Sequence, residues 1–377
     1  MIYLDNAATS YPKPELVYRR VDEVLRTVAG NPGRGGHRGA LEASRVVFHA
    51  REAVSRLTGI VDSSRIVFTK NATEAINIAL KGLGLKPPDH IITTSFEHNS
   101  VVKTVGRLEA RGVRVTRLKP DKDGFIIPGD IEAAVTETTR LVCISHASNV
   151  FGTIQPIKHI GSFCATHGVL FMVDAAQTLG AFPVDLGEIN IDILAATGHK
   201  ALFGPQGTGF LYVREGLEPD PLVDGGTGDL ETVLEMPDRL EAGTMNTPGI
   251  GGLSAGVEFL LKEGVEKIRE FEAGLMGRLL KGLEGIEGVS VIGTKDPSKR
   301  VSLVSFNMEG KNPVEAGIKL DTEHSIMVRC GTHCAPYAHR AAGSYPEGAI
   351  RVSPGYFNRP EEIDEFLRAI KNLKEKN

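Results

Sequence analysis

The chain has 377 residues, with 43 Lys and Arg against 47 Asp and Glu, so its formal net charge is −4. This balance excludes a polybasic nucleic-acid or membrane-surface binder as the default function. With 41% hydrophobic and 24% charged residues, the composition is that of an ordinary globular protein. No apolar run approaches the roughly 20 residues that span a bilayer, and the start MIYLDNAATS lacks a signal-peptide pattern, so we expect a cytoplasmic protein.

The first two thirds of the chain predict a large α/β unit. Residues 15–29 and 40–57 carry apolar side chains at helical spacing. Seven β-rich apolar runs then follow, with helical stretches between many of them, at 73–83, 100–110, 128–135 and 156–167. Because several runs are apolar on both faces, we expect a mainly parallel seven-stranded sheet between helices. The runs are residues 65–69, 90–94, 113–118, 141–146, 169–174, 191–196 and 209–213.

The last third of the chain predicts a smaller α+β domain. A long helical stretch is expected up to residue 283, then strands at 289–293, 301–307 and 326–329, and a closing helix at 360–373. We expect residues 16–245 to form the large domain, and residues 1–15 with 246–377 to form the small one.

Unusual side chains follow several of the predicted strands, where ligands of open α/β sheets collect. Thr73 opens a helix, whose free first-turn amides can hold a phosphate, although a plain N-cap explains this residue equally well. Asp174 ends an apolar strand, where a carboxylate is costly unless something positive meets it. Strand-end aspartates that only cap the next helix are also common.

Lys200 lies among apolar and glycine residues in the segment TGHKALFGPQG, where desolvation can expose a neutral amine for Schiff-base chemistry. Thr197 and His199 beside it can donate to an anion. His98 offers an aromatic face for stacking and a proton that exchanges near neutral pH. Asn149 could bond a carboxylate or a ring oxygen. Together these groups describe the needs of pyridoxal 5′-phosphate.

The four cysteines do not make a disulfide framework in a chain of this length. Cys143 lies in a β-run and Cys164 on a helix, so both are expected to be buried small hydrophobes. Cys330 could be structural or could resolve an oxidised Cys334. A metal site built from these two cysteines and His333 needs more ligands than the stretch supplies, so no metal is expected.

An ordered set of motifs resembles the class V, fold type I aminotransferases that depend on pyridoxal 5′-phosphate, in their cysteine desulfurase and selenocysteine lyase branch. The likeness is to the SufS-like group, although RCGTHC replaces the doubled histidine of that group. It covers nearly the whole chain. The motifs are DNAAT (residues 5–9), NATEAIN (71–77), EHNS (97–100), SNVFGT (148–153), VDAAQ (173–177), TGHK (197–200), EAGTMNTPG (241–249) and RCGTHCAP (329–336).

The resemblance implies roles for residues that would bind the cofactor. Lys200 would bond to it covalently, Asp174 would pair with its ring nitrogen, and Gln177 would contact its ring oxygen. His98 would stack on the ring. The phosphate would be held by Thr73, Thr197 and His199, and by Thr244, which maps onto a contact that the partner subunit of a homodimer supplies in this family.

The resemblance also implies a reaction, in which L-cysteine becomes L-alanine and its sulfur forms a persulfide on Cys334. Asn149 and Arg351 would hold the substrate carboxylate, since a planar guanidinium suits two oxygens. Lys200 would remove the α-proton, and His98 would shuttle a proton. An acceptor protein or a small thiol would then take the sulfur, for iron–sulfur cluster or similar assembly.

Other functions remain open from the sequence. Selenocysteine lyase or cysteine sulfinate desulfinase activity would need the same lysine and depend less on Cys334, and another class V aminotransferase-type reaction is a further alternative. A cofactor-binding protein without turnover would need neither a mobile thiol nor an arginine clamp. A nicotinamide dehydrogenase is disfavoured, because no Gly-x-Gly-x-x-Gly turn follows the first strand.

Overall fold

The computed structural model describes residues 1–33, 35–226 and 234–375. Within these ranges a seven-stranded sheet has the order β2-β8-β7-β6-β5-β3-β4, in which β8 is antiparallel to its neighbours and the other pairings are parallel. The predicted mainly parallel seven-stranded sheet is therefore confirmed. Its strands are β2 (Ile66–Thr69), β3 (His90–Thr94), β4 (Arg114–Leu118), β5 (Thr139–Ser145), β6 (Leu170–Asp174), β7 (Ile193–Thr197) and β8 (Gly209–Val213).

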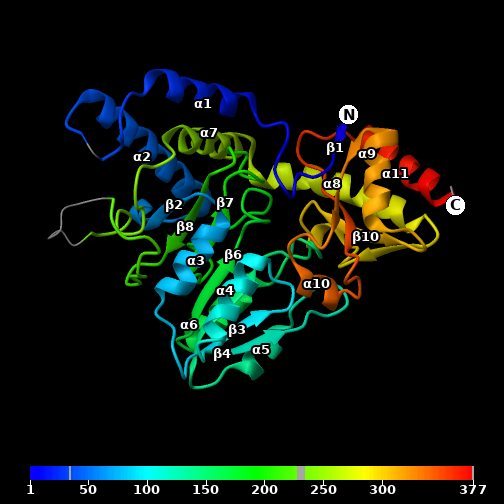
Figure 1. The fold of residues 1–377 in the computed structure, drawn as a ribbon, viewed down its shortest axis with the longest axis horizontal. Helices are drawn as coiled ribbons and strands as arrows, with labels where there is room; N and C mark the ends of the chain where they lie inside the picture. The colour runs from blue at the N-terminus through cyan, green and yellow to red at the C-terminus, as the bar shows by residue number, and fades with distance from the viewer. Residues whose placement is uncertain (34, 227–233, 376–377) are drawn as a thin grey trace.

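Helices cover both faces of this sheet (Figure 1). Successive residues of a strand point to opposite faces, so in β6 Phe171 and Val173 pack into one apolar layer while Met172 packs into the other. The first layer also holds α2, α6 and α7, and the second holds α3 and α4. The helices of this larger unit are α1 (Glu15–Thr27), α2 (Arg38–Thr58), α3 (Ala72–Gly82), α4 (Asn99–Glu109), α5 (Pro128–Ala134), α6 (Ile157–Thr166) and α7 (Thr247–Glu263).

A smaller α+β unit contains an antiparallel sheet of order β12-β13-β10-β9 and the parallel pair β1-β11. This confirms the expected smaller C-terminal part of the fold. Figure 1 shows both chain termini in this unit. Its elements are β1 (Ile2–Tyr3), α8 (Val265–Glu284), β9 (Val289–Ile292), β10 (Val304–Met308), α9 (Pro313–His324), β11 (Ile326–Met327), β12 (Arg329–Gly331), α10 (Pro336–Ala341), β13 (Ala349–Val352) and α11 (Pro360–Glu375).

The structure differs from the sequence-based expectations mainly in this smaller unit. The long helical stretch up to residue 283 is two helices, because Gly264 between α7 and α8 has a φ of 87°. The run at 326–329 divides into β11 and β12, which belong to different sheets. Helix α9 escaped prediction because it buries few side chains, and its Val314 and Ile318 are exposed.

The first residues of the chain join the smaller unit before the chain crosses to the larger one. Ile2 pairs with Ile326, and Asp5 forms an isolated bridge with Ser353. The domain boundary near Met245 stays a prediction, and the helix that follows it, α7, packs against α1 and α2. None of the described helices is long and apolar enough to cross a membrane.

Candidate active site

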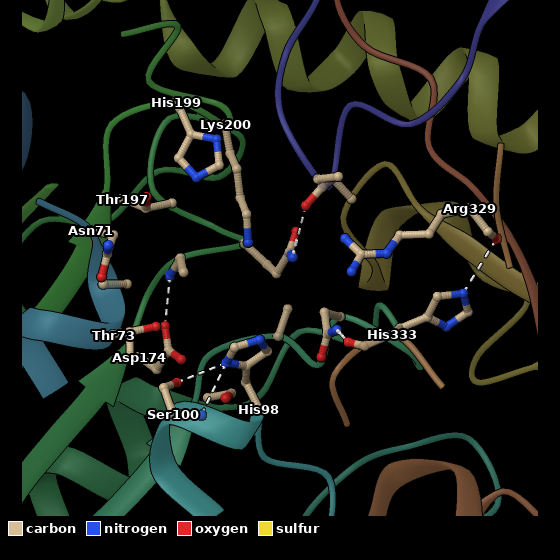
Figure 2. Close-up of a pocket in the computed structure, with 18 of the residues that line it drawn as sticks. Asn71, Thr73, His98, Ser100, Asp174, Thr197, His199, Lys200, Arg329 and His333 are labelled. Atoms are coloured by element: carbon tan, nitrogen blue, oxygen red, sulfur yellow. Dashed lines mark hydrogen bonds between the residues drawn. The ribbon is translucent and has the colours of Figure 1, made fainter. Parts of the chain in front are cut away.

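A cavity of about 210 Å³ lies beyond the carboxyl ends of the parallel strands, between the two units (Figure 2). Asp174 is the last residue of β6 and Thr197 the last residue of β7, so both strands deliver a polar side chain directly to the cavity wall. The structure thus brings together most of the predicted site residues. Those that line the cavity are Thr73, His98, Asn149, Asp174, Gln177, Thr197, His199, Lys200 and Arg351.

One corner of the cavity is built to receive an anion. Asn71 caps α3, its Oδ1 accepting from the Glu74 amide at 2.9 Å, and Ala72 and Thr73 of the first turn line the wall. Nearby, the buried Thr197 Oγ1 and His199 Nδ1 have no hydrogen-bond partner among the described residues. Buried polar atoms are normally paired, so these two atoms fit a site whose missing partners come from a ligand.

Lys200 and Asp174 form the charged centre of the cavity. Burial lowers the pKa of Lys200 to about 8, against the opposing effect of Asp174, and Arg351 and Arg329 lower it further. Burial also raises the pKa of Asp174, which the Ala176 amide, donating to Oδ1 at 2.9 Å, and Lys200 partly offset. The site therefore holds a lysine that gives up its proton more readily than usual beside a carboxylate that lacks solvent.

His98 presents a neutral imidazole to the cavity. It caps α4, its Nδ1 accepting from the Ser100 amide at 3.2 Å and lying 2.8 Å from Ser100 Oγ. Burial, followed by the nearby Lys200 charge, lowers the pKa of His98 to about 4. Since Nδ1 accepts from the amide, the ring proton is on Nε2. The ring can therefore stack on an apolar face and donate or relay a proton from one defined atom.

Arg351 of the smaller unit and Asn149 of the larger unit lie together on one side of the cavity. Arg351 is 1% exposed; its Nη2 pairs with Asp5 Oδ1 at 2.7 Å and its Nη1 donates to the Asn149 carbonyl at 3.3 Å. Its buried Nε has no partner among the described residues. The Asn149 side chain donates from Nδ2 to the His333 carbonyl at 2.6 Å. A carboxylate that binds here thus meets an arginine whose Nε donor is still free.

Cys334 lies at the edge of the cavity and does not line it. It is exposed, and Arg329 Nη2 lies 3.6 Å from its Sγ. His333, the residue before it, does line the cavity, opposite the anion corner in Figure 2. Cys330 packs against the core of the smaller unit, and Cys143 and Cys164 are buried as expected. In the described part of the chain, no group of three or more His, Cys, Asp or Glu side chains could hold a metal ion.

Thr244, a further predicted site residue, does not line this cavity either. It is exposed, accepts from Asn31 Nδ2 at 3.2 Å, and lines a different cavity together with Lys70 and Asn246. Its expected role was a contact to the cofactor of a partner subunit, and that role stays a prediction.

Sequence reasoning assigned no role to several side chains that shape the site. Arg329 lines the cavity, and Asp5 holds Arg351. Glu97 is fully buried at the end of β5, where its carboxylate accepts hydrogen bonds from the backbone N and the Oγ of Ser145. Asp5, Glu97 and Arg329 lie within the motifs DNAAT, EHNS and RCGTHCAP. Their place inside these motifs is the sequence signal that could have identified them as site residues.

The match to a known family covers almost the whole chain: the model described as aminotransferase class-V matches residues 2–366. The chain belongs to the aminotransferase class-V family. A relative named probable cysteine desulfurase, from Methanothermobacter thermautotrophicus, is 38% identical over 371 residues, 96% of this chain and 92% of the relative. A protein of Clostridium botulinum named cysteine desulfurase IscS is 34% identical over 392 residues, 99% of this chain and 94% of that protein.

Solved structures agree with this family assignment. The apo structure of a cysteine desulfurase from Thermococcus onnurineus superposes with a TM-score of 0.94 at 35% identity, covering 100% of this chain and 95% of that one. The cysteine desulfurase CsdA of Escherichia coli gives 0.88 at 29% identity, covering 98% and 94%. Because an IscS name occurs among the relatives, the comparisons assign the class-V family but do not decide the SufS-like branch.

Proposed function

We propose that this protein is a cysteine desulfurase, which converts L-cysteine to L-alanine and transfers the sulfur to Cys334. The observation that carries the proposal is Lys200, a lysine whose pKa is lowered to about 8 by burial, in a cavity bordered by the loop of an exposed cysteine. The full-length relatives named cysteine desulfurase support the same activity.

The cavity fits pyridoxal 5′-phosphate as the cofactor. The unpaired Thr197 Oγ1 and His199 Nδ1 and the first turn of α3 suit its phosphate, and the buried Asp174 carboxylate suits a protonated ring nitrogen. When bound, this cofactor supplies an electron sink for the carbanion left by loss of the α-proton. The residues that would hold it are Thr73, His98, Asp174, Gln177, Thr197, His199 and Lys200.

The side chains of the cavity then divide the work on the substrate. Arg351 and Asn149 orient the carboxylate, which turns the α-hydrogen toward the amine of Lys200. With a pKa of about 8, that amine is neutral often enough near pH 7 to accept the α-proton. His98 carries a proton on Nε2, which it can donate to the reacting carbon skeleton; once that proton has left, the same nitrogen can accept one from the thiol.

The sulfur step uses the thiolate of Cys334. Its Sγ forms a bond to the substrate sulfur, while the bond between that sulfur and Cβ breaks and leaves its electron pair on the carbon skeleton. The skeleton takes up one proton at Cβ and regains one at Cα from Lys200, which gives alanine, and the enzyme keeps Cys–S–SH. One cysteine and one enzyme thiol therefore give one alanine and one persulfide, with no external oxidant or reductant.

The test replaces Cys334 by Ser in the purified holoenzyme, with Cys330→Ser as the matched control. We expect Cys334→Ser to abolish alanine release from cysteine, and mass spectrometry to find one added sulfur on Cys334 in wild type and in Cys330→Ser. Alanine release from cysteine at the wild-type rate by Cys334→Ser would contradict the proposal and favour selenocysteine lyase or cysteine sulfinate desulfinase activity.

Further parts of the proposal concern the assembly and its setting. We also propose that the protein belongs to the SufS-like branch, on the ordered set of motifs other than RCGTHC, which departs from the doubled histidine of that branch, and that it is cytoplasmic. We also propose a homodimer in which Thr244 reaches the cofactor phosphate of the partner subunit. A sulfur-acceptor protein would take the outer sulfur of the persulfide on the exposed Cys334, for iron–sulfur cluster assembly.

A further inference from the structure

Two neutral histidines form a hydrogen-bonded chain beneath the Cys334 loop. His333 Nε2 lies 3.3 Å from the Arg329 carbonyl oxygen, and His333 Nδ1 lies 3.2 Å from His339 Nε2. His339 Nδ1 in turn lies 2.8 Å from Ser344 Oγ. Both rings are buried, and burial lowers the pKa of His333 to about 2 and that of His339 to about 4. Each ring therefore has one N–H donor and one acceptor at neutral pH.

This chain of hydrogen bonds has a single direction, because a carbonyl oxygen can only accept. His333 donates from Nε2 to the Arg329 carbonyl, which leaves its Nδ1 to accept from His339 Nε2. His339 Nδ1 then accepts from the Ser344 hydroxyl. Removing any one member leaves a buried polar atom without its partner.

The loop above this chain has an uncommon backbone conformation. His333 and Cys334 are consecutive residues with φ values of 50° and 58°, in the left-handed region that side chains adopt only when their surroundings hold them there. Two residues of the larger unit donate hydrogen bonds to the backbone carbonyls of this loop. Asn149 Nδ2 donates to His333 O at 2.6 Å, and the Asn99 amide donates to Cys334 O at 2.8 Å. In the smaller unit, His339 holds the His333 ring by a hydrogen bond.

We propose that His339 is a positioning residue for Cys334. It acts through His333 and fixes the backbone from which the thiol is presented, 3.6 Å from Arg329. His339 does not line the cavity, so it acts on the sulfur step without touching the substrate. The inference rests on the proposed role of Cys334 as sulfur acceptor, and it adds a dependence on His339 and Ser344.

The test compares two substrates in the holoenzyme. Cysteine needs the thiol as sulfur acceptor, whereas cysteine sulfinate can lose its sulfur as sulfur dioxide with no thiol involved. Because a small misplacement of reacting groups can cost about 10²-fold, we expect His339→Leu to lower kcat for cysteine by about that factor. Its KM for cysteine and its turnover of cysteine sulfinate should stay unchanged. His339→Gln, whose side-chain amide can still donate to His333, should recover most of the loss.

A second readout does not depend on turnover. The Asn99 amide lies in the larger unit and is bonded to the Cys334 carbonyl, so its hydrogen exchange reports whether the loop keeps its place. We expect faster exchange of this amide in His339→Leu, and a smaller increase in Ser344→Ala, which removes only the end of the chain. If His339 only stabilised the fold, its replacement would raise hydrogen exchange across α10 and β13 in addition to Asn99.

Several outcomes would overturn the inference: equal losses for both substrates, full cysteine turnover in His339→Leu, or unchanged Asn99 exchange in Ser344→Ala. The serine variant removes one hydroxyl and keeps the inference testable where His339→Leu does not fold. Failure of the proposed function has a different signature, since Cys334→Ser would then desulfurate cysteine as fast as wild type.

Discussion

Arg351 and Asp5 form an ion pair, with 2.7 Å between Nη2 and Oδ1, at the place where a substrate carboxylate would bind. Arg351, from β13, lines the cavity, and Asp5, from the beginning of the chain, contacts its guanidinium. The guanidinium is neutralised before any ligand arrives, and an incoming carboxylate must share it with Asp5.

We expect Asp5→Asn to destabilise the unliganded protein, because it leaves the buried Arg351 charge without its partner. Breaking a buried pair in this way costs about 3–5 kcal/mol, and the 20% exposure of the Asp5 side chain favours the lower end. Thermal unfolding should also show that L-alanine, a carboxylate ligand, stabilises Asp5→Asn more than wild type. In the variant, the carboxylate of L-alanine no longer competes with Asp5 for the Arg351 guanidinium. Equal stabilisation of the two proteins would contradict this account.

Lys200 should make the cofactor-free protein less stable below about pH 8. Its pKa is about 8 in the folded protein against 10.5 when exposed, so between these values the unfolded state binds more protons and stability rises with pH. We expect Lys200→Met to be more stable than wild type at pH 7 by about 3 kcal/mol, from roughly 1.4 kcal/mol per pKa unit. Chemical denaturation at several pH values should show this gain disappearing above pH 10.5. Lys70→Met, which replaces an exposed lysine, is the matched control for the loss of a lysine side chain.

Gly256 sets the position of the loop that carries Lys200. A Cβ on this residue of α7 would lie 2.2 Å from the Leu202 carbonyl oxygen and 3.0 Å from the Phe203 carbonyl carbon. We expect Gly256→Ala to displace that loop, to cost about 1–3 kcal/mol of stability and to reduce activity. Gly274→Ala in α8 is the matched control, because a Cβ there meets nothing within 4 Å. It should be neutral or stabilise by about 0.5–1 kcal/mol.

Glu97 should titrate near neutral pH. Burial raises its pKa to about 7, although Thr94 Oγ1 donates to it at 2.5 Å and Ser145 Oγ at 2.6 Å. Between pH 4.5 and 7 the folded state therefore holds the extra proton, and the contribution of Glu97 to stability falls as pH rises. We expect the stability of wild type relative to Glu97→Gln to decline over this interval in urea titrations.

A second variant at the same position separates charge from hydrogen bonding. Glu97→Ala leaves the Ser145 and Thr94 donors buried and unpaired, each costing about 1–3 kcal/mol. It should therefore be clearly less stable than Glu97→Gln at every pH. Equal stabilities of the two variants would show that the hydrogen bonds contribute nothing.

The predictable part of the fold and site is the part governed by local pattern. The strands of the larger sheet are apolar runs, and Asp174 and Lys200 stand where such runs end, so periodicity and strand-end logic locate them. Helix α9 lacked a signal because its side chains are mostly exposed. The hydrogen bond between His333 and His339 depends on two residues in the left-handed conformation, which no spacing rule shows. Likewise, the pairing of Asp5 with Arg351 depends on the path of the whole chain.

The pairing of Ile2 with Ile326, and the bridge between Asp5 and Ser353, bear on how the protein is made. At roughly 5–20 residues per second, the ribosome releases the first segment tens of seconds before its partners exist. Until then Asp5 has no arginine to meet, although the strands that carry Asp174 and Lys200 can already form their sheet. A nascent chain stalled before β13 would hold the lysine and the anion corner but could not select a carboxylate, so substrate recognition is among the last properties the molecule acquires.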